Sequence, residues 1–174
     1  MTFRVLLASG CAAVCFGCAS LPPYTPPQAG EPFASLAFVP QENPVPGAFQ
    51  EDLRIADNSR CDTLRLLGSF NTADKGAART PPRTVRIRAG ETLFLSPIVE
   101  ELYGIGHVRC ASVVSFAPVP GRVYRVSHRY QVRPTEFSRV EFRCSASVVD
   151  ELTGRPPPDL AAYPVHRLSR CISD

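Results

Sequence analysis

The chain has 174 residues, of which 44% are hydrophobic and 20% charged, and its formal net charge is +3. This length suits one domain with short extensions, and the apolar content is sufficient for a hydrophobic core, which excludes a wholly disordered chain. Such a weak positive charge gives no reason to expect nucleic acid as a partner.

The N-terminal residues 1–17 are predicted to be an export signal. Arg4 is followed by an uncharged, apolar run that reaches Gly17. This run is too short to span a bilayer comfortably as a permanent helix, and its features are typical of a signal peptide. We therefore expect this segment to be absent from the mature protein.

Small Gly17 followed by Cys18 resembles the lipobox of bacterial lipoproteins. The resemblance covers the first twenty residues, and it departs from the family's pattern at Cys15, where the family prefers leucine. It implies that Cys18 is acylated and becomes the first mature residue. The alternative is ordinary cleavage after Ala19, since Gly17 and Ala19 are both small.

Acylation would attach the protein to a membrane without a transmembrane helix. Each buried methylene contributes about 0.8 kcal/mol, and more than one chain is needed for stable anchoring. Residues 18–32 are then predicted to be the anchor and a tether, because repeated prolines favour an extended, semi-rigid spacer. These prolines are Pro22, Pro23, Pro26, Pro27 and Pro32.

Four cysteines follow the tether, namely Cys61, Cys110, Cys144 and Cys171. An even number in an exported chain predicts two disulfides, and no spacing among them fits a zinc site. If three consecutive strands form a meander, Cys110 and Cys144 are separated by about 9.5 Å, beyond the roughly 7 Å limit for a bridge. This favours Cys61–Cys110 and Cys144–Cys171, whereas a different strand order would favour Cys110–Cys144 with Cys61–Cys171.

Residues 33–174 are predicted to form an all-β, antiparallel two-sheet sandwich. Apolar and polar residues alternate most clearly in 107–116, 122–130 and 139–149, the pattern of half-buried strands. Because each sheet must cover an apolar face, several short strands separated by proline and glycine indicate two packed sheets.

Other elements are predicted from shorter patterns. Strands are expected at 33–39 and 63–70, a hairpin at 84–88 and 92–95, and a final edge strand at 163–168. A short helix is expected at 97–103, with Ser96 as its cap and Pro97 in its first turn.

The segment 116–124 resembles a hairpin of small β-sandwich lipoproteins of Gram-negative bacteria. The resemblance covers about ten residues, supports the architecture and implies no activity. Together with the lipobox it implies a lipid-anchored, periplasm-facing protein of the cell envelope, with the outer membrane favoured over the inner membrane.

No pattern predicts a catalytic, metal or cofactor site. His107, His128 and His166 lie outside metal-ligand spacings, and no serine has a nucleophile-elbow motif. His128 falls on an apolar strand face, where a satisfied histidine of the core is expected. Adjacent carboxylates such as Glu51 and Asp52 are expected to be solvated.

A binding surface is the stronger prediction. If even-numbered residues of the three clearest strands face inward, four arginines point outward on one sheet face: Arg109, Arg125, Arg129 and Arg143. Guanidinium groups suit carboxylate, phosphate or sulfate, so an envelope protein or an anionic glycan could bind there. We therefore expect a non-catalytic, membrane-anchored interaction or structural module, with a small periplasmic hydrolase or hydrolase inhibitor as the alternative.

Overall fold

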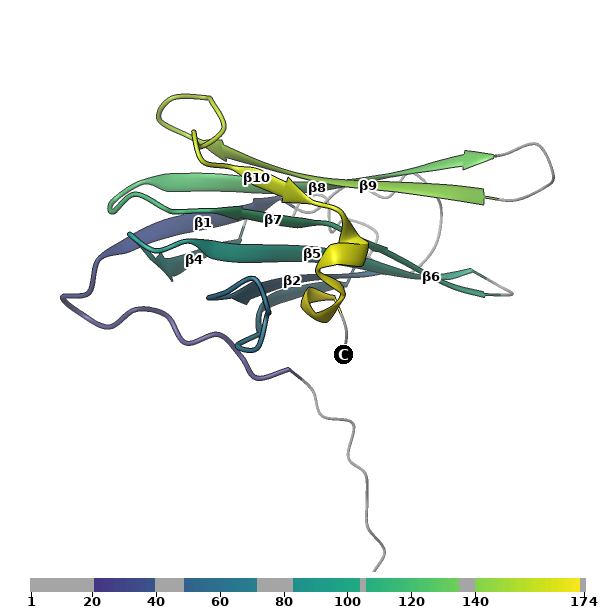
Figure 1. Ribbon diagram of the computed structural model, residues 1–174, viewed down its shortest axis with the longest axis horizontal. Helices are drawn as coiled ribbons and strands as arrows, with labels where there is room; N and C mark the ends of the chain where they lie inside the picture. The colour runs from purple at the N-terminus through teal and green to yellow at the C-terminus, as the bar shows by residue number, and fades with distance from the viewer. Residues whose placement is uncertain (1–20, 40–48, 72–82, 104–105, 135–139, 173–174) are drawn as a thin grey trace, which may run out of the picture.

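The computed structural model describes residues 21–39, 49–71, 83–103, 106–134 and 140–172. Their strands form two sheets packed against each other, which confirms the predicted all-β sandwich (Figure 1). One sheet has the order β4-β1-β8-β9, with bounds Arg83–Arg88, Phe33–Val39, Val123–Pro134 and Val140–Asp150. The other sheet has the order β10-β7-β5-β2-β3, and β6 also pairs with β5. In that order its strands are Ala161–Tyr163, Val113–Phe116, Leu93–Tyr103, Phe49–Ala56 and Arg65–Asn71, and β6 is Gly106–Ala111.

The core lies between the sheets and follows the strand alternation. Phe116 of one sheet packs edge-on against Tyr124 of the other, with ring centroids 4.9 Å apart. Both side chains belong to a buried cluster that also holds Leu36, Ile87 and Leu95. Burial of these alternate positions is the main favourable contribution to this fold.

The chain crosses between the sheets where two hairpin-like connections were predicted. β4 pairs with β1 in one sheet while β5 lies in the other, so the hairpin predicted at 84–88 and 92–95 is wrong. β7 and β8 also lie in different sheets, because β8 pairs in parallel with β1. The two crossing loops are hydrogen-bonded, since the Gly90 N–H donates to the Pro118 carbonyl at 2.8 Å.

The crossing after β7 explains why the favoured disulfide pairing is wrong. Cys110 on β6 and Cys144 on β9 lie in opposite sheets rather than two strands apart in one sheet, and they are bonded with a Cα–Cα distance of 5.8 Å. Cys61 is bonded to Cys171, with a Cα–Cα distance of 5.1 Å. One bridge therefore joins the two sheets, and the other fixes the C-terminal end of the chain.

The segment predicted as a helix, 97–103, is instead the second part of β5. Pro97 lies in this strand, where its carbonyl accepts the Ser112 N–H at 3.1 Å. Proline has no N–H to return to Ser112, so the ladder is interrupted there. Ser112 consequently separates β6 from β7, although both keep one register with β5.

Two other segments differ from the prediction. β2 was not predicted, because Glu51 and Asp52 stand next to each other and leave only a short alternating run after them. The final edge strand is β10 at Ala161–Tyr163, so the strand predicted at 163–168 is wrong beyond Tyr163, where two 3-10 turns follow at Val165–Arg167 and Ser169–Cys171. Pro164 ends the pairing, since proline cannot donate to a ladder.

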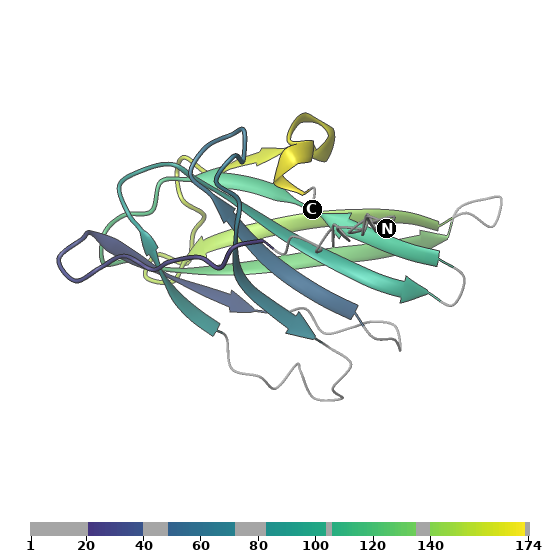
Figure 2. The same ribbon diagram turned by 90° about the horizontal axis from the view of Figure 1, so that it is seen from below.

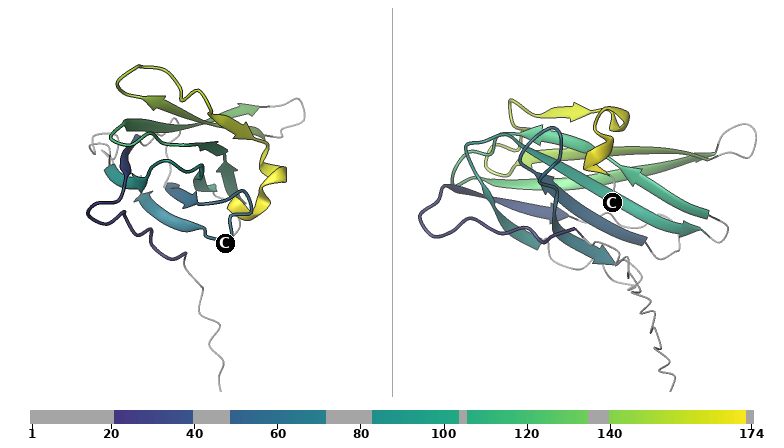
Figure 3. Two further views of the ribbon diagram at one scale, coloured as in Figure 1. Left: turned by 60° about the vertical axis from the view of Figure 1, so that its left-hand side comes forward. Right: turned by 60° about the horizontal axis from the view of Figure 1, so that its bottom comes forward.

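The proline-rich segment 21–32 lies along the domain instead of extending away from it. The Tyr24 N–H donates to the Leu66 carbonyl at 2.9 Å, and the Leu66 N–H donates to the Pro22 carbonyl at 3.0 Å. The Tyr24 ring packs against the core, and Pro27 is buried. This purple segment thus covers the outer edge of β3 (Figure 3), so 21–32 is not a free spacer.

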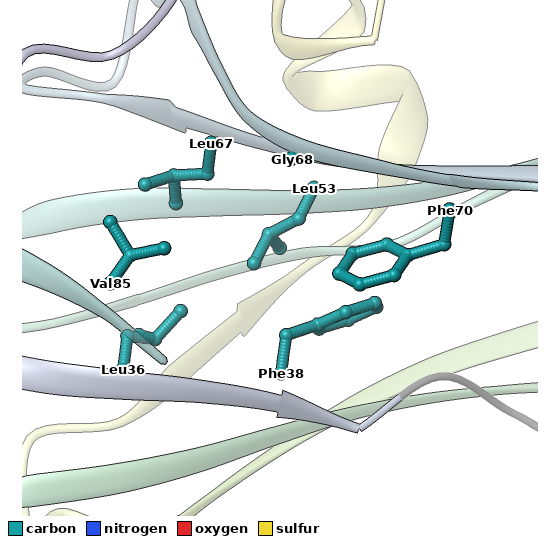
Figure 4. Close-up of a pocket in the computed structure, with 7 residues that line it drawn as sticks. All are labelled: Leu36, Phe38, Leu53, Leu67, Gly68, Phe70 and Val85. Atoms are coloured by element: carbon teal, nitrogen blue, oxygen red, sulfur yellow. The ribbon is translucent and has the colours of Figure 1, made fainter. Parts of the chain in front are cut away.

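The packed interior leaves little free volume. A cavity of about 10 Å³ between Leu36, Phe38, Leu53 and Phe70 is closed in by apolar side chains (Figure 4). Ligand sites are larger by more than tenfold, so this cavity is a packing gap. Across the described ranges, no helix is long and apolar enough to span a bilayer.

Candidate functional site

Three of the four predicted arginines share the outer face of the four-stranded sheet. Arg125 and Arg129 lie on β8 and Arg143 lies on β9, and all three side chains are exposed. Their strand neighbours Val126 and His128 are buried, so the alternation predicted for these strands is correct. Arg129 is opposite Ser145 and therefore diagonal to Arg143, a separation of about 7 Å between Cβ atoms.

Arg109 does not belong to this face. It lies on β6 of the other sheet, next to Cys110, whose side chain points inward to the disulfide. Its guanidinium is 3.0 Å from the Glu100 carboxylate across the β5–β6 ladder. Placing Arg109 with the other three was therefore wrong, because β6 and β8 belong to different sheets.

Two arginines of β4 extend the same surface. Arg86 and Arg88 are exposed on the edge strand, opposite Ser35 and Phe33 of β1. The Arg86 guanidinium lies 4.7 Å from the centroid of the Phe33 ring, a cation–π contact that covers this exposed aromatic side chain. We call these five residues the arginine face: Arg86, Arg88, Arg125, Arg129 and Arg143.

Two carboxylates at the end of β9 form ion pairs with arginines of this sheet. Glu151 lies 3.6 Å from Arg125, and Asp150 lies 3.5 Å from Arg122 at the end of β9. The rest of the β8–β9 surface is small and polar, with the Ser127 and Ser147 hydroxyl oxygens 2.7 Å apart. This surface can present several guanidinium groups to an anion.

A second candidate site is a buried polar cluster that joins the two sheets. His128 projects inward from β8, and its Nε2 lies 3.3 Å from the Ser112 hydroxyl oxygen. Its Nδ1 lies 3.3 Å from Oε1 of Glu51 on β2. We call Ser112, His128 and Glu51 the Ser-His-Glu cluster.

The Ser-His-Glu cluster is nearly closed to solvent. Glu51 is 0% exposed, His128 1% and Ser112 7%. The histidine–glutamate contact is close but lacks hydrogen-bond alignment, and neither carboxylate oxygen of Glu51 has a hydrogen bond among the described residues. Buried polar groups are ordinarily hydrogen-bonded, so this carboxylate is a costly feature in an otherwise apolar interior.

Ser112 also lines an open cleft of about 280 Å³ between the edges of the two sheets. The walls come from β6, β7, β9, β10 and the start of the C-terminal turns, and they include Val114, Ser145, Ala162 and Val165. The β9 and β10 edges that border this opening lie on the same side of the molecule (Figure 2). Ser112 thus lies between the buried His128 and a space that is open to solvent.

The sequence pattern predicted only part of this cluster. The inward position of His128 is confirmed, but Glu51 is buried rather than solvated. Leu53 and Ile55 of the same strand are buried, and their alternation places Glu51 on the inner face. His166 is exposed on the first 3-10 turn, and the side chain of His107 lies outside the described residues.

Two further observations bear on function. Within the described ranges, no three histidine, cysteine or acidic side chains come together in a way that could hold a metal ion. Comparison with protein-family models, with curated proteins and with solved structures gives no match for this chain.

Proposed function

We propose that this protein is a lipid-anchored module of the bacterial cell envelope that faces the periplasm and binds an anionic glycan without catalysis. The observation that carries the proposal is the arginine face, in which five exposed guanidinium groups share one sheet surface. Arginine binds carboxylate and phosphate through paired hydrogen bonds, so this surface suits a polymer that carries repeated anionic groups.

Export is supported independently of the arginine face. The two disulfides, Cys61–Cys171 and Cys110–Cys144, are typical of a non-reducing compartment. The lipobox-like sequence ending at Cys18 supplies the anchor in this proposal, and the outer membrane is favoured. Intact-mass measurement of the membrane fraction tests the anchor, with Cys18→Ser as the matched variant that cannot be acylated.

A glycan fits this surface better than an acidic protein does. Arginine suits both kinds of partner, but protein interfaces add large aromatic anchors such as Trp and Tyr that fill pockets. The β8–β9 surface instead carries Ser127, Ser145 and Ser147 between its arginines, and the aromatic ring of Phe33 is covered by Arg86. Serine hydroxyls and guanidinium groups both donate hydrogen bonds to sugar oxygens and acidic substituents.

The test is binding of purified protein to lipopolysaccharide and to an anionic polysaccharide at increasing salt. Arg129→Ser/Arg143→Ser should weaken binding about tenfold or more, because it removes two of the five charges while both strands keep their pairing. Arg155→Ser is the matched control, since Arg155 is exposed in the β9–β10 connection and is outside the arginine face. Equal binding by the wild type and the double variant would overturn the proposal.

A specific observation favours a hydrolase as the second candidate. The Ser-His-Glu cluster has the order of a nucleophile, a base and an orienting carboxylate, and its serine lines the open cleft. In this alternative, Ser112 Oγ attacks an ester carbonyl while His128 Nε2 takes the hydroxyl proton and then gives it to the departing alcohol. Water attacks the acyl-serine in the second half, regenerates the hydroxyl and releases the carboxylic acid.

A fluorophosphonate probe separates the two candidates. Under the hydrolase alternative the folded wild type is labelled, Ser112→Ala abolishes the labelling, and Ser145→Ala leaves it unchanged. Ser145 is the matched control because it lines the same cleft and is exposed. Absence of labelling in the folded wild type excludes the hydrolase and leaves the binding module.

A further inference from the structure

The described chain begins at the surface of the domain, beside the C-terminal turns. Leu21 packs against a buried cluster that contains Cys61 and Cys171, together with Leu168 and Ile172. Figure 1 and Figure 3 agree that the purple start of the chain lies near the C-terminal end and on the side opposite the β8–β9 hairpin. The chain therefore joins the domain at one defined place.

The docked segment after Leu21 prevents this junction from moving away from the domain. It is held by two backbone hydrogen bonds to Leu66 and by the Arg88 N–H, which donates to the Tyr24 hydroxyl oxygen at 3.2 Å. The Tyr24 ring packs on the main core, and Pro27 is buried. Several contacts between Pro22 and Pro27 make this segment part of the domain rather than a linker.

The distance from the acylated residue to the domain is consequently very small. Three residue steps separate Cys18 from Leu21, and a fully extended chain covers about 11 Å over three steps. An acylated Cys18 lies at the lipid headgroups, so the part of the domain around Leu21 must lie within this distance of them. A domain held this closely has few orientations open to it.

The surface around this junction has the chemistry of a membrane interface. Leu21, Leu168 and Ile172 are partly exposed apolar side chains. Basic residues stand beside them in the chain, since Arg167 and Arg170 flank Leu168 and Arg60 precedes Cys61, and all three arginines are exposed. Arginine stems beside apolar residues suit the headgroup region, where the charge meets phosphate and the apolar part meets the acyl boundary.

Two of the arginines on this surface form ion pairs with Asp62. Asp62 is 3.0 Å from Arg60 and 3.6 Å from Arg170, so one carboxylate serves two guanidinium groups. Arg167 adds a third guanidinium group in the same turn region. We call this surface the anchor end: Leu21, Arg60, Arg167, Leu168, Arg170 and Ile172.

We propose that the anchor end rests on the lipid headgroups and that the docked segment 21–32 thereby turns the arginine face toward the periplasm. This inference rests on the acylation of Cys18 in the proposed function. The partner of the anchor end is the bilayer surface itself, with phosphate groups opposite its arginines. The β8–β9 hairpin lies on the far side of the domain, where the arginine face can meet a soluble anionic polymer.

The absence of tryptophan from the chain gives a direct test. The acylated full-length protein is reconstituted into vesicles that contain brominated phospholipid, which quenches tryptophan at short range. A single tryptophan is introduced by Ser169→Trp at the anchor end or by Leu152→Trp in the β9–β10 connection. Both positions are exposed, Leu152 to 77%, so neither substitution disturbs the core.

Quenching should be at least threefold stronger for Ser169→Trp than for Leu152→Trp. Insertion of ten Gly and Ser residues between Ser20 and Leu21 should reduce the quenching of Ser169→Trp, because the domain can then leave the surface. Equal quenching at both positions, or no effect of the insertion, would overturn the proposed orientation.

The outcome is separable from failure of the anchor. Flotation of the protein with the vesicles, compared with Cys18→Ser, measures acylation alone. Protein that floats without preferential quenching contradicts the orientation and leaves the anchored module in place. Protein that lacks acyl chains and fails to float contradicts the anchor, on which the orientation depends.

Discussion

The imidazole of His128 reaches from one sheet to the other, so that its Nδ1 lies 3.3 Å from Oε1 of Glu51. Both side chains are completely buried, and the cluster is bordered by the apolar core on one side and the Cys110–Cys144 bridge on the other. A polar link of this kind fixes how the two sheets face each other. Its effect on stability depends on whether both partners are present.

Glu51→Ala should lower the free energy of unfolding by about 3 kcal/mol or more, because it leaves the imidazole buried without its partner. Urea denaturation with intact disulfides measures the loss. Glu51→Leu/His128→Leu should lower the free energy of unfolding far less, since replacing a buried pair with apolar residues of similar volume is often neutral. If the double variant loses as much stability as Glu51→Ala, the two side chains do not act as a pair.

The disulfides make separate and unequal contributions in the second prediction. Cys110–Cys144 closes 34 residues and Cys61–Cys171 closes 110 residues. Loop-closure entropy then predicts losses of about 4 kcal/mol for Cys110→Ser/Cys144→Ser and about 5 kcal/mol for Cys61→Ser/Cys171→Ser. Denaturant unfolding of both double variants measures this order, and peptide mapping without reductant checks the pairing. A peptide joining Cys61 to Cys110 would contradict the structure.

Local patterns predicted much of the fold because each strand carries its own alternation. Val126, His128 and Tyr130 are buried as their spacing indicated, and the outward positions of Arg125 and Arg129 follow from the same period. What the alternation cannot specify is which strand lies next to which. The chain crosses to the other sheet after β7. This crossing places Cys110 opposite Cys144, which is why the predicted disulfide pairing is wrong.

For the Ser-His-Glu cluster, too, the local pattern indicates which side chains face inward but not which of them meet. Glu51, Ser112 and His128 each interrupt an apolar strand face, and three inward polar residues together are a signal for a buried cluster. Their meeting depends on non-local pairing, because Glu51 belongs to β2 and His128 to β8 in the opposite sheet. A short stretch of sequence around Glu51 or His128 therefore does not show that the other residue is its neighbour, nor how far apart the two side chains lie.

Gly121 lies in the crossing loop before β8. Its φ angle is 75°, and its N–H donates to the Phe33 carbonyl at 2.8 Å. An added Cβ would meet no atom within 4 Å, so the cost of substitution is conformational. Gly121→Ala should therefore cost about 1 kcal/mol in unfolding experiments, and Gly121→Asn should cost less because asparagine tolerates this region. A larger loss for asparagine than for alanine would contradict this explanation.

Tyr24 fixes the proline-rich segment 21–32 to the domain. Burial raises the pKa of its phenol above 10.0, and this effect exceeds the opposing effects of the Arg88 N–H bond and the Arg88 charge. A raised pKa in the folded state means that the folded protein holds this proton more tightly than the unfolded chain. The resulting stability is fully present below about pH 10, the ordinary tyrosine value, and is lost as pH rises through the folded pKa.

Tyr24→Phe separates this titration from those of the other tyrosines. At pH 8 the variant should be less stable than the wild type by about 1 kcal/mol, because the Arg88 N–H loses its acceptor. As pH rises above 10, the wild type loses stability and the difference between the two should shrink. Urea denaturation at several pH values measures the difference, and absorbance titration of both proteins isolates the Tyr24 phenol. A gap that widens with pH would show that the pKa of Tyr24 is lowered in the folded state instead.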